Sequence, residues 1–209
     1  MTEPIVQHLG VQDYRSTLER MHHFTDSRTT ETTDELWLLQ HPPIYTLGQA
    51  GDHTHVLDAA GIDVVNSDRG GQVTYHGPGQ LIVYLLVDLR RGALGVRSLV
   101  DTMESAVIEL LARHGVESNS RKDAPGVYVC QRKIAALGLR VRRGCTFHGL
   151  SLNVDMDLTP FSGINPCGYS GLAVTQLKDE GIDLTVEQAG KQLSTILIEA
   201  ITPDNKADQ

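Results

Sequence analysis

The sequence is poor in cysteine, with three cysteines among 209 residues. Cys130, Cys145 and Cys167 stand at unrelated spacings, and an odd number does not fit a disulfide framework. No Cys-x-x-Cys pair and no HExxH motif indicates zinc, so we expect no metal and no cofactor. Reduced thiols are typical of the cytoplasm, and we expect the protein there.

Positive charge is also in short supply, because the net charge is −8 and the isoelectric point about 5.5. Binding to nucleic acid needs a basic surface, so we expect no such partner. No apolar run approaches the roughly 20 residues of a membrane span. Residues 1–10 lack the basic and apolar segments of a secretory signal, so we expect no membrane association.

Apolar residues recur at helical spacing in three segments, which predicts helices over 11–24, 98–114 and 185–200. Residue pairs at capping-box spacing, Ser98 with Asp101 and Thr185 with Gln188, mark the start of the last two. Short apolar runs predict strands at 35–40, 62–65, 72–75, 80–89, 126–130, 134–141 and 147–154. The segment His76-Gly77-Pro78-Gly79 predicts a hairpin between the strands on either side of it.

The order of these elements predicts the fold class. Strands come in runs, and the last three are joined by short polar turns, so they are expected to be antiparallel. No Pro/Ser-rich linker divides the chain. We therefore expect one α+β (mixed α/β) domain over residues 1–209, with a largely antiparallel sheet flanked by helices and a frayed polar tail at 203–209.

Cys167 is the first candidate for chemistry. It lies between Pro166 and Gly168 in the loop-like segment FSGINPCGYSG. Catalytic residues concentrate on loops, whereas buried strand cysteines behave as small hydrophobes. Cys130, at the end of a strand, fits the second description, and Cys145 is ambiguous. The pattern alone leaves two interpretations of Cys167, a nucleophile or a loop cysteine without a role.

A nucleophilic thiol needs an activating group, because free cysteine has a pKa near 8.5. No charged residue lies between Pro160 and Leu177, so the group must come from elsewhere: Lys133, His76 or His148. Lys133 heads an apolar strand, where it is either an ordinary solvated lysine or a partly desolvated base. His148, alone on a strand, is more typical of a structural histidine.

A glycine-rich block runs from Arg69 to Gln80, RGGQVTYHGPGQ. Glycine pairs permit close approach of a ligand, so the block forms either a pocket wall or two ordinary turns. It matches neither the dinucleotide fingerprint nor the P-loop, and no GxSxG motif indicates a serine hydrolase.

Four blocks together resemble the lipoyl(octanoyl) transferase family. They are HPPIYTLG from His41, RGGQVTYHGPGQLIVYLLVDL from Arg69, APGVYV from Ala124 continued by KIAALGLRVRRGCTFHGLSLNVDMDL from Lys133, and FSGINPCGYSGLAVTQL from Phe161. The resemblance implies a fold related to the catalytic domains of biotin protein ligases and lipoate–protein ligases. It implies transfer of an octanoyl or lipoyl group from acyl carrier protein to a lysine of lipoyl domains, without ATP. The acceptors would be the E2 subunits of 2-oxoacid dehydrogenases and the glycine cleavage H protein.

The resemblance also implies site residues. Cys167 and Lys133 match the family's catalytic dyad, with an acyl thioester on Cys167. The substrate-binding residues would be Arg69, Gly70, Gly71, Gln72, Val73, Thr74, Tyr75, His76, Ala136, Leu137, Gly138, His148, Gly149, Leu150 and Ser151. Ala136 stands where the family often has Ser, so a hydroxyl contact there would be missing.

Three other interpretations remain open: an ATP-dependent lipoate or biotin ligase, a lipoyl-relay amidotransferase, and a noncatalytic acyl-binding module. Against the ligase, His76 is followed by Gly77, where lipoate ligases typically have a His-Asp pair. The stretch 121–143 holds seven basic residues against one acid, which indicates either a docking patch for an acidic carrier protein or a solvated hairpin rim. We expect a monomer.

Overall fold

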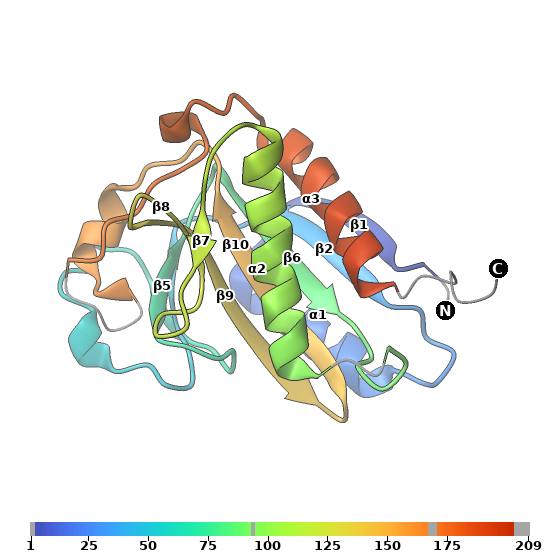
Figure 1. Cartoon of the computed structure of the whole chain (residues 1–209). Helices are drawn as coiled ribbons and strands as arrows, with labels where there is room; N and C mark the ends of the chain where they lie inside the picture. Colours follow the sequence, from blue (N-terminus) through green and yellow to red (C-terminus); the bar gives the residue numbers. More distant parts are fainter. Residues whose placement is uncertain (1–2, 93–94, 167–170, 203–209) are drawn as a thin grey trace.

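A seven-stranded sheet forms the centre of the computed structural model, which describes residues 3–92, 95–166 and 171–202 (Figure 1). Its strand order is β1-β2-β6-β10-β9-β8-β7. The strands are β1 (Ile5–Val11), β2 (Glu35–Gln40), β6 (Gln80–Leu86), β10 (Cys145–Asn153), β9 (Arg132–Arg142), β8 (Val127–Val129) and β7 (Asn119–Ser120). Only β1 and β2 run parallel; the other pairs of this sheet are antiparallel.

Smaller elements complete the fold. A second sheet has the order β4-β3-β5, with β3 (Ile44–Leu47), β4 (Val64–Asn66) and β5 (Val73–His76). The helices are α1 (Tyr14–Ser27), α2 (Val96–Arg113) and α3 (Val186–Ile201), and the short 3₁₀ turns are η1 (His53–His55), η2 (Thr159–Gly163) and η4 (Lys178–Glu180). In the described part of the chain, no helix is long and apolar enough to span a membrane.

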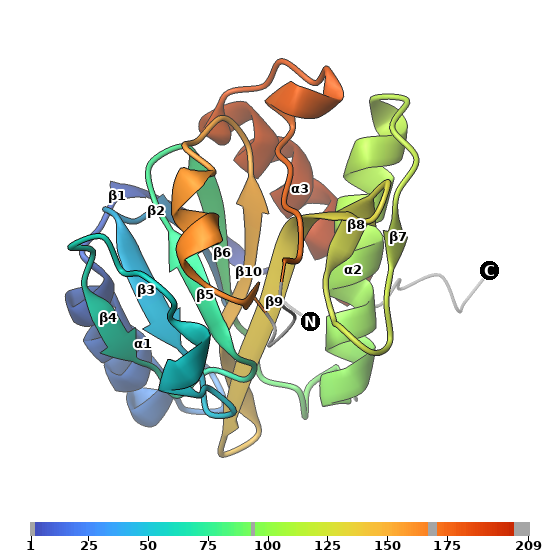
Figure 2. The ribbon, with the colours of Figure 1, turned by 90° about the vertical axis from the view of Figure 1, so that its left-hand side faces the viewer.

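The large sheet is covered on both faces. Helices α2 and α3 pack side by side on one face, and α1 lies on the other, next to the small sheet (Figures 1 and 2). Side chains of a strand alternate between faces, so Leu36 and Leu38 of β2 join the α2/α3 core while Trp37 and Leu39 join the α1 core. Burial on both faces explains why β2 and β6 are almost continuously apolar.

The predicted fold class, a mixed α+β fold with a largely antiparallel sheet, is confirmed. The predicted hairpin around His76–Gly79 is wrong, because β5 pairs with β3 and β6 pairs with β2 and β10. The segment instead carries the chain from one sheet to the other. Gly79 makes this crossing possible: its φ is 86°, and a Cβ there would lie 1.9 Å from the Asp155 carbonyl oxygen.

Two helix ends differ from their predictions, and one agrees. The Thr185 hydroxyl accepts from the Gln188 N–H, and the Gln188 side chain closes the capping box of α3 as predicted. At α2, Gly95 occupies the N-cap without a side-chain bond, so the predicted box at Ser98 is absent. Asp13 caps α1, which begins at Tyr14 because Val11 belongs to β1. Strands β1, β3 and β7 were not predicted.

Candidate active site

A cavity of about 770 Å³, counted to its open mouth, lies between the α1 face of the large sheet and the small sheet. It brings together most of the residues expected from the resemblance: Lys133, Arg69, Gly71, Gln72, Val73, Thr74, His76, Ala136, Leu137, Gly138, His148, Gly149, Leu150 and Ser151. That these residues bind substrate remains a prediction.

Two expected residues do not line the cavity within the described part of the chain. The Tyr75 ring packs between Tyr45 and Phe161, with ring centroids 5.5 Å apart in each case, within the hydrophobic core of the small sheet. The Gly70 amide donates to the Leu139 carbonyl oxygen at 3.0 Å and so joins the glycine-rich block to the edge of β9. Both residues support the wall from behind.

The cavity floor is made of small residues from neighbouring strands. Gly138 and Ala136 of β9 pair with Gly149 and Ser151 of β10, so the four lie side by side. A Cβ at Gly138 would lie 2.8 Å from the carbonyl oxygen of Gly70. The absence of larger side chains on this floor leaves the room that the cavity needs.

Sequence reasoning missed several cavity residues. They are Tyr14, Ile82, Tyr84, Ile134, Ala135, Asn153, Phe161, Pro166 and Val174. Tyr14 stood on the predicted helical stripe, and Ile82 and Tyr84 share one face of β6 because they are two positions apart. These patterns predict burial, but they do not say that a cavity lies there.

Lys133 is almost fully buried, with 4% of its surface exposed, which rules out the solvated interpretation. Its Nζ donates to the Pro125 carbonyl oxygen at 3.0 Å and lies 5.3 Å from the centre of the Tyr128 ring. Its backbone bonds to the segment that follows the cysteine loop, at Ala173 and Thr175. A desolvated ammonium is therefore held at one end of the cavity.

Arg69 and His76 form a polar network beneath the cavity. The Arg69 guanidinium donates to the Thr46 hydroxyl and carbonyl oxygens at 2.8 and 2.5 Å. His76 bonds to Thr46 Oγ1 at 3.3 Å through Nε2 and to Gln80 Oε1 at 2.8 Å through Nδ1. Burial, aided by neighbouring His41, lowers the pKa of His76 to about 3, so it is a neutral orienting group at neutral pH.

His148 has an unusual backbone, with φ at 61°. Consecutive strand side chains normally point to opposite faces. Here Phe147 lies in the α1 core and the His148 ring also lies on that side, 5.9 Å from the Tyr84 ring. Its Nε2 is 2.8 Å from Asp68 Oδ1. Burial opposes ionisation of Asp68, but hydrogen bonds from His148 and His22 lower the pKa of Asp68 to about 2. The His148 side chain is thus oriented toward the cavity by a carboxylate.

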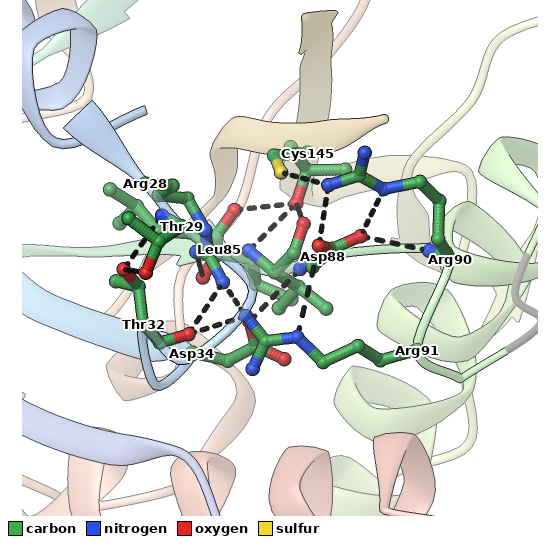
Figure 3. Close-up of polar contacts among 12 residues, drawn as sticks. Arg28, Thr29, Thr32, Asp34, Leu85, Asp88, Arg90, Arg91 and Cys145 are labelled. Carbon is green, nitrogen blue, oxygen red and sulfur yellow. Dashed lines mark hydrogen bonds and ion pairs between the residues drawn. The ribbon is translucent and has the colours of Figure 1, made fainter. Parts of the chain in front are cut away.

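Cys145, 2% exposed, lies at the start of β10 within a cluster of charged side chains (Figure 3). It pairs with Arg142, at the opposite end of β9 from Lys133. Its Sγ is 3.8 Å from Arg90, whose guanidinium donates twice to the Asp88 carboxylate, at 2.9 and 2.7 Å. Burial raises the pKa of the Cys145 thiol, so this residue is not a ready nucleophile.

Cys130 was interpreted as a buried strand cysteine, and this is wrong. Cys130 and Gln131 have φ values of 46° and 69° and form the two-residue turn between β8 and β9. Such a turn projects into solvent, so Cys130 is exposed. Cys167 lies outside the described residues. Its covalent neighbour Pro166 lines the same cavity as Lys133.

The basic stretch 121–143 does not form one patch. Lys133 is buried, and Arg132 pairs with Glu180 at 2.9 Å. Arg142 pairs with Asp26 at 3.0 Å, ten residues further along β9 and so about 33 Å away. The part of the stretch around Arg121 and Arg132 lies near Lys133, since Arg121 and Lys133 both contact the Tyr128 ring, whereas Arg142 lies far away.

Comparison with known proteins first defines a class. Lipoate-protein ligase A bound with ATP shares this fold with a TM-score of 0.79 at 17% identity, over 95% of this chain and 85% of that one. Biotin protein ligase from Aquifex aeolicus gives a TM-score of 0.59 at 14% identity, over 94% and 70%. The family model of the lipoyl protein ligase A/B catalytic domain matches residues 13–198, so the chain belongs to this family.

Within this family the chain belongs to the octanoyltransferases. It is 57% identical over 202 residues to the octanoyltransferase of Dechloromonas aromatica (strain RCB), covering 97% of this chain and 98% of that one. It is 56% identical over 201 residues to that of Alkalilimnicola ehrlichii (strain ATCC BAA-1101 / DSM 17681 / MLHE-1), covering 96% and 94%. The resemblance seen in the sequence is confirmed.

Proposed function

We propose that this octanoyltransferase moves an octanoyl group from octanoyl-acyl carrier protein to a lysine of a lipoyl domain, through a thioester on Cys167. The observation that carries the mechanism is the buried Lys133 side chain, which lines the same mainly apolar cavity as Pro166, the residue before Cys167. Membership of the octanoyltransferases supports the substrate.

The reaction has two steps. The Cys167 thiolate attacks the donor thioester, the bond to the carrier's sulfur breaks, and that sulfur leaves as a thiol after taking a proton. The acceptor lysine then attacks the acyl-enzyme, an amide forms, and Cys167 leaves. Each turnover releases one proton from the acceptor ammonium. Lys133 stabilises the thiolate as an ammonium and passes protons between the amine and the sulfur.

The acyl chain would occupy the cavity over the small-residue floor of β9 and β10. The lining is mainly apolar, as an octanoyl chain requires, and His76 and Arg69 orient the polar wall behind it. We further expect the acceptors to be E2 lipoyl domains and the glycine cleavage H protein, and the enzyme to act as a monomer.

Intact-protein mass spectrometry tests the thioester. Mixing the protein with octanoyl-acyl carrier protein, without ATP, should add one octanoyl group. The adduct should disappear in Cys167→Ser and persist in Cys130→Ser and Cys145→Ser, which remove an exposed and a buried thiol as matched controls. Product formation that needs ATP and free octanoate would instead support a ligase.

A further inference from the structure

The end of the Lys133 side chain rests on the loop Ala124–Gly126. Its Nζ donates to the Pro125 carbonyl oxygen at 3.0 Å. Gly126 packs against the lysine stem so closely that a Cβ there would lie 2.7 Å from Lys133 Cε and 3.1 Å from Nζ. The loop therefore contacts both the Lys133 ammonium and the stem that carries it.

A buried carboxylate on α2 holds the loop. Glu104 Oε1 accepts from the Gly126 N–H at 2.9 Å, 22 residues away in sequence. Figure 2 shows α2 alongside β7 and β8, the strands that flank this loop. On the other side of the loop, the Tyr128 hydroxyl donates to the Ala124 carbonyl oxygen at 2.7 Å.

Glu104 stands out from its own helix. It is 6% exposed, and its buried neighbours on α2, such as Met103 and Val107, are apolar. Among the described residues, no cation forms an ion pair with it. A buried carboxylate without a cation is costly, and an apolar side chain would suit this core position better. Its one hydrogen bond goes to the residue that touches Lys133.

We infer that Glu104 is a positioning residue for acyl transfer, which acts on the Lys133 ammonium through the Gly126 amide. This inference rests on the proposed role of Lys133. Glu104 touches neither substrate nor reacting atoms; its acceptor oxygen fixes the loop whose carbonyl orients the lysine. The acceptor oxygen of Glu104, rather than its negative charge, fixes the loop.

The experiment measures the rate at which octanoyl-acyl carrier protein acylates Cys167 in the full chain. Glu104→Leu removes the acceptor and should slow acylation about tenfold or more. Glu104→Gln keeps an oxygen at this position and should stay within about threefold of the wild type. Val107→Ala truncates a fully buried residue of the same helix and should lower the melting temperature without slowing acylation.

A double mutant separates positioning from mere stabilisation. In a Lys133→Ala background, Glu104→Leu should cause no further loss, because its effect passes through the lysine. An undiminished loss in that background, a Gln variant as slow as the Leu variant, or a Leu variant as fast as the wild type would each overturn the inference. If Glu104→Leu does not fold, Glu104→Ala replaces it under the same criteria. Absence of any adduct on the wild type would refute the proposed function instead.

Discussion

Lowering the pH from 7 to 5 is expected to destabilise the protein through two buried histidines, His41 and His76. Burial lowers the pKa of His41 to about 4 and that of His76 to about 3. In the unfolded chain both pKa values return to about 6.5. Below that value the unfolded chain binds more protons, so the stabilising contribution is complete above pH 6.5 and is lost as the pH falls.

The magnitude follows from the pKa difference. Between pH 6.5 and 5 each histidine loses about 2 kcal/mol, at roughly 1.4 kcal/mol for each pH unit, and the pair loses about 4 kcal/mol. That is a large share of a typical free energy of unfolding, about 5–15 kcal/mol. The pKa values of Asp68 and Asp88 are about 2. These carboxylates therefore change the free energy of unfolding only below about pH 4, outside the range from pH 7 to 5.

Urea unfolding at pH 7, 6 and 5 measures the loss, with the fluorescence of buried Trp37, the only tryptophan, as the signal. Burial also lowers the pKa of His148, so this histidine adds to the loss. His76→Gln should therefore reduce the loss by about 2 kcal/mol, whatever it does to stability at pH 7. The matched control is His23→Gln at an exposed position, which should leave the dependence unchanged. A free energy of unfolding that changes by less than about 1 kcal/mol between pH 7 and 5 would refute this reasoning.

Three further predictions concern the site. Gly126→Ala would place a Cβ 2.7 Å from Lys133 Cε, at a φ of 145°. Acylation should therefore slow on the order of 100-fold, measured by single-turnover mass spectrometry. A rate near that of the wild type would contradict this. Gly138→Ala would place a Cβ 2.8 Å from the Gly70 carbonyl oxygen, on the cavity floor, so it should destabilise the protein by about 1–3 kcal/mol. It should also weaken binding of an octanoyl analogue, measured by calorimetry, and unchanged affinity would contradict this. Lys122 is exposed and lies two residues before the loop Ala124–Gly126, which contacts Lys133. Lys122→Glu should therefore raise KM for the carrier protein more than Arg143→Glu at the far end of β9, and the reverse order would place the docking surface elsewhere.

Local structure was predicted where the signal lies within one segment. The strand Glu35–Gln40 was predicted with its observed bounds, because Gln40 is followed by His41-Pro42-Pro43 and proline cannot continue a ladder. The capping box at Thr185 is equally local. The hairpin at His76–Gly79 failed because turn residues show that the chain changes direction but not which strand it joins next.

The sequence by itself named the residues that we propose for the chemistry: Cys167 in an uncharged loop, Lys133 at the head of an apolar strand, and a glycine-rich block that allows close approach. Only the tertiary structure decided that Lys133 is buried and that Pro166 lines the same cavity, 33 positions along the chain. The physical reason is that burial depends on which distant segments pack together. Glu104 shows this most clearly, because nothing in its local sequence connects it to Gly126.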